Sequence, residues 1–392
     1  MKASQRNVSM FSQDAMDKLD SFSQASQSMI SALIVNYHCA NLTCASVASV
    51  LAENLNVEVI VVDNSADDDE LKRLRQILPP EVTLLSNMQN NGFGKACNWA
   101  YQHSQGDMIL LLNPDAHLLP GALAQMQTTL LNHPDAGAVG PKVYWDINKK
   151  FLLPPSIFPS PLYNLIMGKA GIFCGLLHKI YSAIFRYNSI RYWLASKPLL
   201  QSALSGGHML LSRQAIEQSG GLFDEQFFMY FEDTDLILRL RKTGYKLYFE
   251  PRAECVHHYQ HSANKMQMMH VSGPQFYAKH FHNSIFFRLS TRLSNRTVDF
   301  DNIISLEKTL IAIDFPVPLI LREHWLFEFG FSDSFVPSIG YFGSGEVASI
   351  PEECWKLLHP GRYFIRISKP TLWRNKNICW TFEIPDPEEN LR

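Results

Sequence analysis

The sequence predicts an α/β protein with a Rossmann-like, mainly parallel sheet, followed by a small β-rich C-terminal part. From Ser31 onward, short apolar runs alternate with helical patterns, which is typical of βαβ units. The apolar runs contain few polar positions, so both faces of the sheet should be covered, as in parallel sheets. After Thr297 short strand-like runs separated by turn residues replace this alternation, which favours a small β-sandwich.

Each expected element follows from a short stretch of the sequence. Apolar runs predict strands at Ala32–Val35, Glu58–Val62, Val82–Leu85, Met108–Leu112 and Lys246–Glu250. Helical patterns predict helices at Cys44–Asn54, Asp68–Leu78, Ala96–Ser104, Gly121–Asn132, Leu162–Ile184 and Leu236–Thr243. The later strands are expected at 310–313, 325–331, 362–367 and 377–384.

Composition bounds the number of domains and excludes some function classes. A length of 392 residues favours two or three domains. The net charge of -2 gives no overall positive field, so nucleic acid is not an expected partner. Seven cysteines without a C-x-x-C pair argue against a disulfide framework or a structural zinc site and favour a reducing cytoplasm.

We expect three segments along the chain. Residues 1–29 lack an apolar core and predict a disordered leader rather than a signal peptide. Residues 30–295 form the α/β domain, in which residues 151–200 form a helical cap, and residues 296–392 form a β-sandwich-like accessory domain. Basic residues on the cap could instead face anionic lipid headgroups, so a peripheral membrane contact remains an alternative. No uncharged run reaches the ~18 residues of a spanning helix.

Polar clusters follow three of the predicted strands directly. They are Asn36-Tyr37-His38, Asp63-Asn64-Ser65 and Asn113-Pro114-Asp115. Ligands of open α/β sheets bind beyond the carboxyl ends of the strands, so these clusters should meet at one edge. Asp115 is suited to hold a divalent cation against a diphosphate, and Asp63 to accept hydrogen bonds from a base or ribose. The alternative is that both carboxylates are turn and cap residues.

Three further segments carry candidate chemistry. Gly92 and Phe93 precede a helical pattern and could bring backbone N–H groups to an anion, although simple capping explains them almost as well. Glu232, Asp233 and Asp235 crowd one helix start. Asp235 is expected to pair with Arg239 at i,i+4, whereas another acid could be a general base. A histidine pair, His257-His258, follows a predicted strand; a structural role and a metal-ligand role are about equally supported, with His261 as a further alternative.

Together these segments resemble the family-two glycosyltransferases of the GT-A fold, and among them the rhamnosyltransferase-like branch. The most specific match is the block Phe223–Leu236, which reads FDEQFFMYFEDTDL. The resemblance covers roughly residues 31–288 and constrains residues 151–201 poorly. It implies a GT-A catalytic domain in which the cap lies on the acceptor side.

The resemblance implies roles for the matched residues. Asp233, beside Glu232, would be the catalytic base, and Asp115 with His257 would hold Mg²⁺ or Mn²⁺. Asn113 stands where the family has the first acid of its D-x-D motif, which implies weaker metal binding. The implied donor-binding residues are Asn36, Tyr37, Asp63, Asn64, Gly92, Phe93, Asn113 and Asp115. The implied acceptor-binding residues are Gly206, Gly207 and His208.

The function implied is that of a metal-dependent, inverting glycosyltransferase. It would move a sugar, with rhamnose from dTDP-rhamnose as one candidate, from a nucleotide-diphosphate donor to a saccharide or lipid-linked saccharide. The implied role is polysaccharide or lipid-linked oligosaccharide synthesis in the cytoplasm or at the inner face of the membrane. The alternative is a catalytically degenerate nucleotide-sugar-binding module that acts through its C-terminal β domain. A dehydrogenase is disfavoured because no G-x-G-x-x-G follows the first predicted strand.

Overall fold

The computed structural model describes residues 28–87, 89–167, 175–258, 265–293, 314–371 and 377–384. Most of the predicted leader, the strand predicted at 310–313 and the candidate ligand His261 lie outside these residues. The description below concerns the six described segments.

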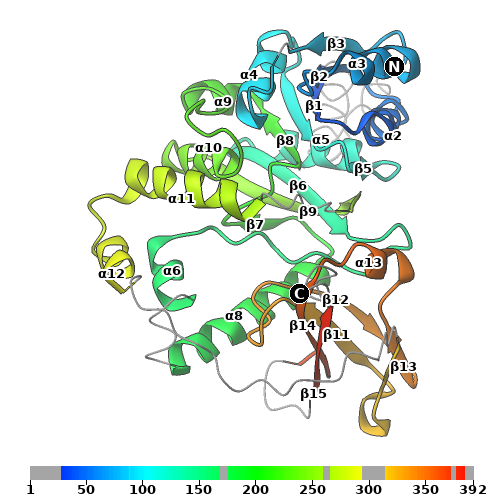
Figure 1. The fold of residues 1–392 in the computed structure, drawn as a ribbon, viewed down its shortest axis with the longest axis vertical. Helices are drawn as coiled ribbons and strands as arrows, with labels where there is room; N and C mark the ends of the chain where they lie inside the picture. Colours follow the sequence, from blue (N-terminus) through cyan, green and yellow to red (C-terminus); the bar gives the residue numbers. More distant parts are fainter. Residues whose placement is uncertain are drawn as a thin grey trace, which may run out of the picture.

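A nine-stranded mixed sheet forms the centre of the fold (Figure 1). Its strands are β1 (Ile30–Asn36), β2 (Val57–Asp63), β3 (Thr83–Ser86), β4 (Met108–Leu112), β5 (Ala116–Leu118), β6 (Ala136–Tyr144), β7 (Leu199–Gln201), β8 (His208–Ser212) and β9 (Lys246–His257). The order is β3-β2-β1-β4-β8-β6-β9-β5, with β7 also paired to β9. The first four strands in this order are parallel, as are β6 and β9, while β8 runs antiparallel to both of its neighbours. The predicted fold class is confirmed.

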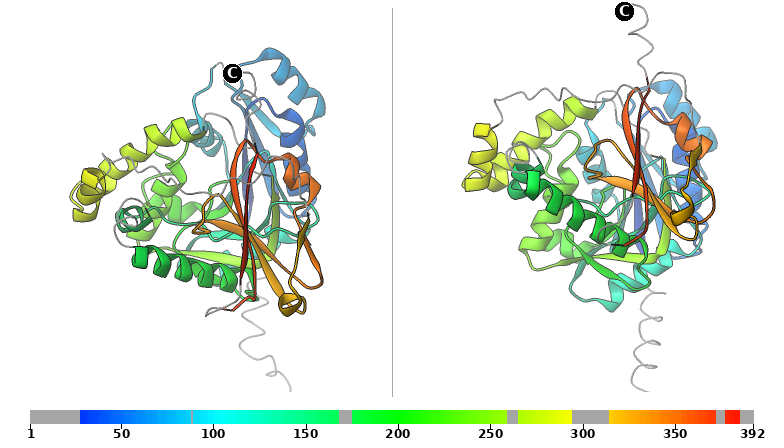
Figure 2. Two further views of the ribbon diagram at one scale, coloured as in Figure 1. Left: turned by 60° about the horizontal axis from the view of Figure 1, so that its bottom comes forward. Right: turned by 90° about the horizontal axis from the view of Figure 1, so that it is seen from below.

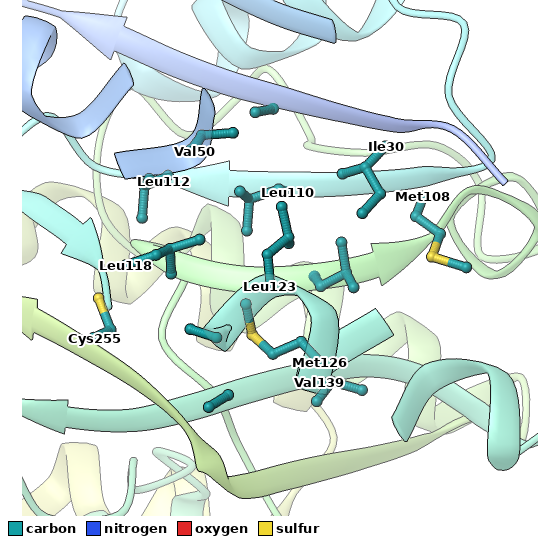
Figure 3. Packing of buried hydrophobic residues seen from close by; sticks show 14 of the residues in the cluster. Ile30, Val50, Met108, Leu110, Leu112, Leu118, Leu123, Met126, Val139 and Cys255 are labelled. Carbon is teal, nitrogen blue, oxygen red and sulfur yellow. The ribbon is translucent and has the colours of Figure 1, made fainter. Parts of the chain in front are cut away.

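Helices cover both faces of this sheet. One face packs on α2 (Ala40–Leu51) and α5 (Ala122–Asn132), and Figure 3 shows the apolar side chains in that layer. The opposite face packs on α4 (Phe93–Gln102), α9 (Arg213–Gln218) and α10 (Glu232–Lys242). Helix α3 (Asp68–Ile77) lies beside α2, and α11 (Lys265–Phe281) lies beyond α10. Burial on both faces explains why the strands are apolar at nearly every position.

Helices α2, α4 (from Phe93) and α10 begin earlier than the sequence pattern predicts, and the reason is visible for α2 and α10. Helix α2 begins at Ala40, and the Glu70 side chain of α3 accepts a hydrogen bond from the Ala40 N–H at 2.7 Å. Helix α10 begins at Glu232 because Tyr230 and Phe231 take positive φ angles of 66° and 71°, which turn the chain just before the helix. Left-handed angles in two successive non-glycine residues are unusual, so this turn could not be predicted from the residue types.

The cap contains two described helices in place of the single one predicted. Helix α6 (Pro161–Met167) and helix α8 (Gly175–Trp193) flank residues 168–174, which lie outside the described segments. Helix α12 (Ile285–Leu293) packs beside α6. Among the helices described, none is both long and apolar enough to cross a membrane.

The C-terminal part forms two small antiparallel sheets. Strands β11 (Trp325–Gly330), β12 (Ser338–Gly343), β14 (Gly361–Ser368) and β15 (Ile378–Ile384) pair in the order β12-β11-β14-β15. Strands β10 (Asp314–Pro316) and β13 (Val347–Ser349) form the other sheet, with the 3-10 turn η1 (Leu319–Leu321) and helix α13 (Glu352–Lys356) nearby. The strands predicted near 325–331, 362–367 and 377–384 are therefore confirmed. The domain boundary at residue 296 falls outside the described segments and stays a prediction.

The core of the C-terminal sheets is shared with the segment that follows β6. Phe151 is fully buried, and its ring lies 5.7 Å from that of Phe327 and 5.0 Å from that of Tyr341. The backbones of Leu152 and Gly340 exchange hydrogen bonds of 2.9 and 3.0 Å. The C-terminal sheet is thus attached to the α/β part of the chain through a common hydrophobic core.

A buried ion pair network adds a second attachment. Glu328 on β11 is 1% exposed and accepts hydrogen bonds from Arg186 of α8 at 3.0 Å and Arg366 of β14 at 2.6 Å. Two cations offset the cost of burying one carboxylate. Both orientations in Figure 2 show the C-terminal strands beside α8, where this network lies. Cap and C-terminal sheet therefore form one packed unit.

We predict that Phe151→Ala lowers the free energy of unfolding by about 3–5 kcal/mol, because it empties the shared core. Denaturant unfolding followed by circular dichroism would measure the change. Leu319→Ala, at a side chain that is 79% exposed in the same C-terminal part, is the control and should change stability little. Equal effects of the two substitutions would contradict a shared core.

Candidate active site

The carboxyl ends of β1 and β2 are joined by a buried polar network. Asn36 and Asp63 are register partners, and the Asn36 Nδ2 donates to Asp63 Oδ1 at 3.0 Å and to the Glu70 carboxylate at 3.1 Å. Asp63 Oδ1 also accepts the Ser65 N–H at 3.1 Å. Asp63 is only 1% exposed, whereas Tyr37 beside it is 54% exposed. The first two predicted polar clusters therefore meet here, and Tyr37 and His38 are exposed beside them.

Asn64 shapes the loop that leads into α4. Its Nδ2 donates to Asn90 Oδ1 at 2.9 Å and to the Gly92 carbonyl at 3.3 Å, and its Oδ1 accepts the Asn91 N–H at 3.1 Å. Gly92 has φ +82°, and a Cβ there would lie 2.2 Å from the Phe228 carbonyl oxygen. Only glycine fits so close an approach. Asn64 and Gly92 therefore position this loop against the Phe227–Phe231 turn.

At the ends of β4 and β9, Asp115 meets His257. The His257 Nε2 lies 3.1 Å from Asp115 Oδ1, and both side chains are largely buried. Nearby, the Asn113 N–H donates to the Gly207 carbonyl at 2.8 Å. A Cβ on Gly207 would lie 2.7 Å from the Asn113 Nδ2 and 3.2 Å from the His257 ring, so this glycine allows three segments to meet.

The donor set around Asp115 is compatible with a divalent cation that is completed by a ligand. Within the described segments, no group of three or more His, Cys, Asp or Glu side chains could hold a metal by itself. Mg²⁺ is commonly held by one or two protein ligands together with substrate phosphates and waters. Of the two described candidate histidines, His257 is the one beside Asp115; the His258 ring lies 5.7 Å from that of His117.

His208 lies behind this pair. It stands opposite Leu112 in the β4–β8 register, and its ring is 5.4 Å from that of His257. Its two ring nitrogens are buried without a hydrogen-bond partner among the described residues. Burial, and then the neighbouring His257, lower the pKa of His208 to about 3. His208 is therefore a neutral side chain that packs edge-to-face against the His257 ring.

Two adjacent carboxyl groups occupy the first turn of α10. Asp233 Oδ2 accepts the Gly206 N–H at 3.1 Å, and Oδ1 accepts the Thr234 N–H at 2.6 Å. Burial raises the pKa of Asp233, although these hydrogen bonds oppose the rise. Glu232 is 6% exposed, and burial, followed by the charge of Asp233, raises its pKa to about 8. At neutral pH Glu232 is therefore protonated beside the Asp233 carboxyl group.

The third acid, Asp235, has a structural role. It is fully buried and bonds Arg239 at 2.7 Å, with Lys279 and His280 of α11 each at 2.6 Å. The predicted Asp235–Arg239 contact is confirmed. The attachment of α11 through the same carboxylate could not be seen in the sequence, because the partners lie about forty residues away.

A cleft of about 380 Å³ gathers many of the candidate residues. Its lining includes these predicted site residues: Phe93, Asn113, Gly206, Gly207, Glu232, Asp233 and His257. The other predicted site residues lie outside its lining: Asn36, Tyr37, Asp63, Asn64, Gly92, Asp115 and His208. Ile157, Pro159 and Met269 also line the cleft, and sequence reasoning did not find them because apolar cap residues carry no recognisable motif.

Similarity to known proteins agrees with this arrangement. The family described as glycosyl transferase family 2 matches residues 31–192. N-acetylglucosaminyl-diphospho-decaprenol L-rhamnosyltransferase of Mycobacterium tuberculosis is 30% identical over 235 residues, which are 57% of this chain and 73% of that protein. The chain belongs to glycosyltransferase family 2. The resemblance to the rhamnosyltransferase-like branch is thereby confirmed.

Other similar proteins share less with this family-two glycosyltransferase. The O-antigen biosynthesis protein RfbC of Myxococcus xanthus is 25% identical over 208 residues, which are 51% of this chain and 15% of that protein. A solved structure of GalNAc-T7 with UDP, GalNAc and Mn²⁺ matches 64% of this chain and 50% of its own, with 15% identity and a TM-score of 0.40. The mannosyltransferase PcManGT from Pyrobaculum calidifontis matches 69% of this chain and 76% of its own, with 16% identity and a TM-score of 0.38.

We predict that Glu232→Gln removes a pH dependence of the glycosyltransferase's stability. In the unfolded chain this carboxyl ionises near its ordinary pKa of 4.5, whereas the folded protein holds the proton up to about pH 8. Its contribution is fully present below pH 4.5 and is lost as pH rises toward 8. Wild type should therefore lose stability relative to Glu232→Gln across this range.

Denaturant unfolding at several pH values between about 4.5 and 8 would measure the difference. Glu323→Gln, which removes an exposed carboxyl of the C-terminal part, is the matched control. A constant stability difference between wild type and Glu232→Gln would show that Glu232 is ionised in the folded protein.

Proposed function

We propose that this glycosyltransferase transfers a sugar, with inversion, from a nucleotide-diphosphate donor to a saccharide hydroxyl. The observation that carries the proposal is that Asp233 and His257 line one cleft, and that the His257 Nε2 lies 3.1 Å from Asp115 Oδ1. These are the two devices that the reaction requires, a base for the acceptor and charge stabilisation for the leaving group.

Asp233 is the proposed general base. The Gly206 and Thr234 N–H groups hold its carboxylate in one orientation, so its remaining lone pairs can accept the proton of an acceptor hydroxyl. Burial raises its pKa, which makes the carboxylate more basic at the pH of the cell. Glu232, protonated beside it, adds no second negative charge and can donate a hydrogen bond within the cleft.

Asp115 and His257 are the proposed residues for a divalent cation, Mg²⁺ or Mn²⁺. When bound, the cation would supply positive charge next to the diphosphate of the donor. Asn113 offers a neutral amide where a second carboxylate would otherwise stand, so the diphosphate meets less negative charge. His208 stays neutral beneath His257 and thereby adds no repulsive positive charge.

The donor would extend from this pair toward β2. Tyr37 offers an exposed ring for a base. The buried Asp63 and Asn64 side chains hold the neighbouring loops in place through their hydrogen bonds to Ser65 and Asn90. The 30% identity to an L-rhamnosyltransferase that acts on an N-acetylglucosaminyl-diphospho-decaprenol supports rhamnose as the sugar. It also supports a lipid-linked saccharide as the acceptor.

Asp233→Asn should lower turnover by about 100- to 10,000-fold, because the acceptor hydroxyl loses its base. The measurement is release of nucleoside diphosphate from dTDP-, UDP- and GDP-sugars in the presence of an acceptor. Donor affinity, measured by calorimetry, should remain near that of wild type. Full turnover by the variant would contradict the assignment, and donor binding by wild type without any transfer would favour a catalytically degenerate nucleotide-sugar-binding module.

Removal of a bound metal should also abolish transfer, independently of the Asp233 substitution. We expect EDTA to abolish transfer, and Mn²⁺ or Mg²⁺ to restore it. Asp115→Asn should raise the metal concentration needed for half-maximal activity by on the order of tenfold. Asp314→Asn, at an exposed carboxyl of β10, is the control. Transfer that is unaffected by EDTA would exclude a role for metal at Asp115.

A further inference from the structure

A second cleft lies between the cap and the C-terminal sheet, and its wall on the C-terminal sheet lies outside the residues 31–192 that the family matches. Its volume is about 410 Å³, within the usual range of small-molecule sites. One wall is Trp145 with the Leu153–Ile157 segment, and the other consists of Phe329, Phe331 and the Pro337–Ile339 segment of the C-terminal sheet. The proposed function assigns nothing to this cleft.

The lining is strongly apolar. Of the described residues that line the cleft, none is charged, and Ser156, Ser338 and Tyr163 are the only ones with a hydroxyl. The Trp145 Nε1–H is already used, since it donates to the His258 carbonyl at 3.0 Å. A saccharide would therefore leave most of its hydroxyls without partners, which is costly. The Phe331 ring is 60% exposed, an apolar surface that a hydrocarbon chain can cover.

The apolar cleft adjoins the cleft that contains Asp233. Ile157 lines the apolar cleft and also the cleft that contains Asp233. Trp145, which lines the apolar cleft, is also tied to the strand that carries His257, because its Nε1–H donates a hydrogen bond to the carbonyl of the next residue, His258. A molecule with its reactive hydroxyl at Asp233 can thus extend past Ile157 to Phe331 without leaving the protein surface.

We propose that this cleft binds the hydrocarbon chain of a lipid-linked acceptor whose sugar lies at Asp233. The proposal rests on the proposed function and names the part of the acceptor that the C-terminal sheet recognises. The occupant is a chain rather than a second sugar because the walls are uncharged and nearly without hydrogen-bonding groups. The C-terminal sheet then supplies acceptor affinity, and residues 30–258 supply the chemistry.

A pair of synthetic acceptors tests the proposal. Both carry the same N-acetylglucosaminyl diphosphate, esterified in one case with a farnesyl chain and in the other with a methyl group. Wild type should show a KM at least about tenfold lower for the farnesyl acceptor, because burial of apolar groups favours it. Phe331→Ala should raise the KM of the farnesyl acceptor and leave the methyl acceptor, the donor KM and kcat unchanged.

Leu319→Ala, which also removes an exposed apolar side chain from the C-terminal part, is the matched control and should change neither KM. Equal KM values for the two acceptors in wild type, or a Phe331→Ala effect on both acceptors alike, would overturn the proposal. If neither acceptor is glycosylated by wild type, the proposed function fails in its choice of acceptor, and a binding measurement then decides on the cleft.

Photo-cross-linking of wild type with farnesyl phosphate that carries a terminal diazirine provides that measurement. Cross-links in peptides containing residues 145–157 or 329–339 would support the proposal whether or not transfer occurs. The competing lipid-facing surface consists of exposed apolar side chains on α8 and α12, such as Leu176, Ile180 and Ile285. Cross-links confined to α8 and α12, or none at all, would overturn it.

Discussion

The close approach of the Gly206–Gly207 backbone to its neighbours is the constraint on which the site depends. A side chain at Gly206 would lie 2.7 Å from the Asp233 Cβ, and one at Gly207 would lie 2.7 Å from the Asn113 amide. Because neither glycine has a side chain, the first turn of α10 and the ends of β4 and β9 can meet around one cleft. This close approach brings Asp233 near the Asp115–His257 pair. It also allows the Gly206 N–H to donate a hydrogen bond to the Asp233 carboxylate.

The two ends of the site differ in their physical character. Toward β2, amide and carboxylate groups form a closed network around Asn36 and Asp63, which holds the strand ends in register. Toward α10, carboxyl groups are buried with fewer partners, and burial changes their protonation. Hydrogen bonding therefore fixes the groups at the β2 end, whereas burial raises the pKa of the carboxyl groups at the α10 end.

Sequence reasoning found the parts of the fold that depend on local pattern. An apolar run followed by polar residues marked β1, β2 and β4, and parallel pairing then placed Asn36 and Asp63 side by side. It missed β6 and β8. It also missed the early start of α10, because the turn at Tyr230 and Phe231 that precedes this helix is held by tertiary packing. It also missed Ile157 and Met269 in the cleft, since an apolar residue that lines a site is indistinguishable in sequence from one that fills a core.

The shared position of Phe151 limits how this chain can evolve. Its ring completes a core whose other walls come from β11 and β12, so the C-terminal sheet is not an exchangeable module. A lineage that replaced this sheet would leave Phe151 and Trp145 facing water. Residues 145–153 and 325–343 contribute to one core, so a change of side-chain volume in either segment alters packing that both segments share.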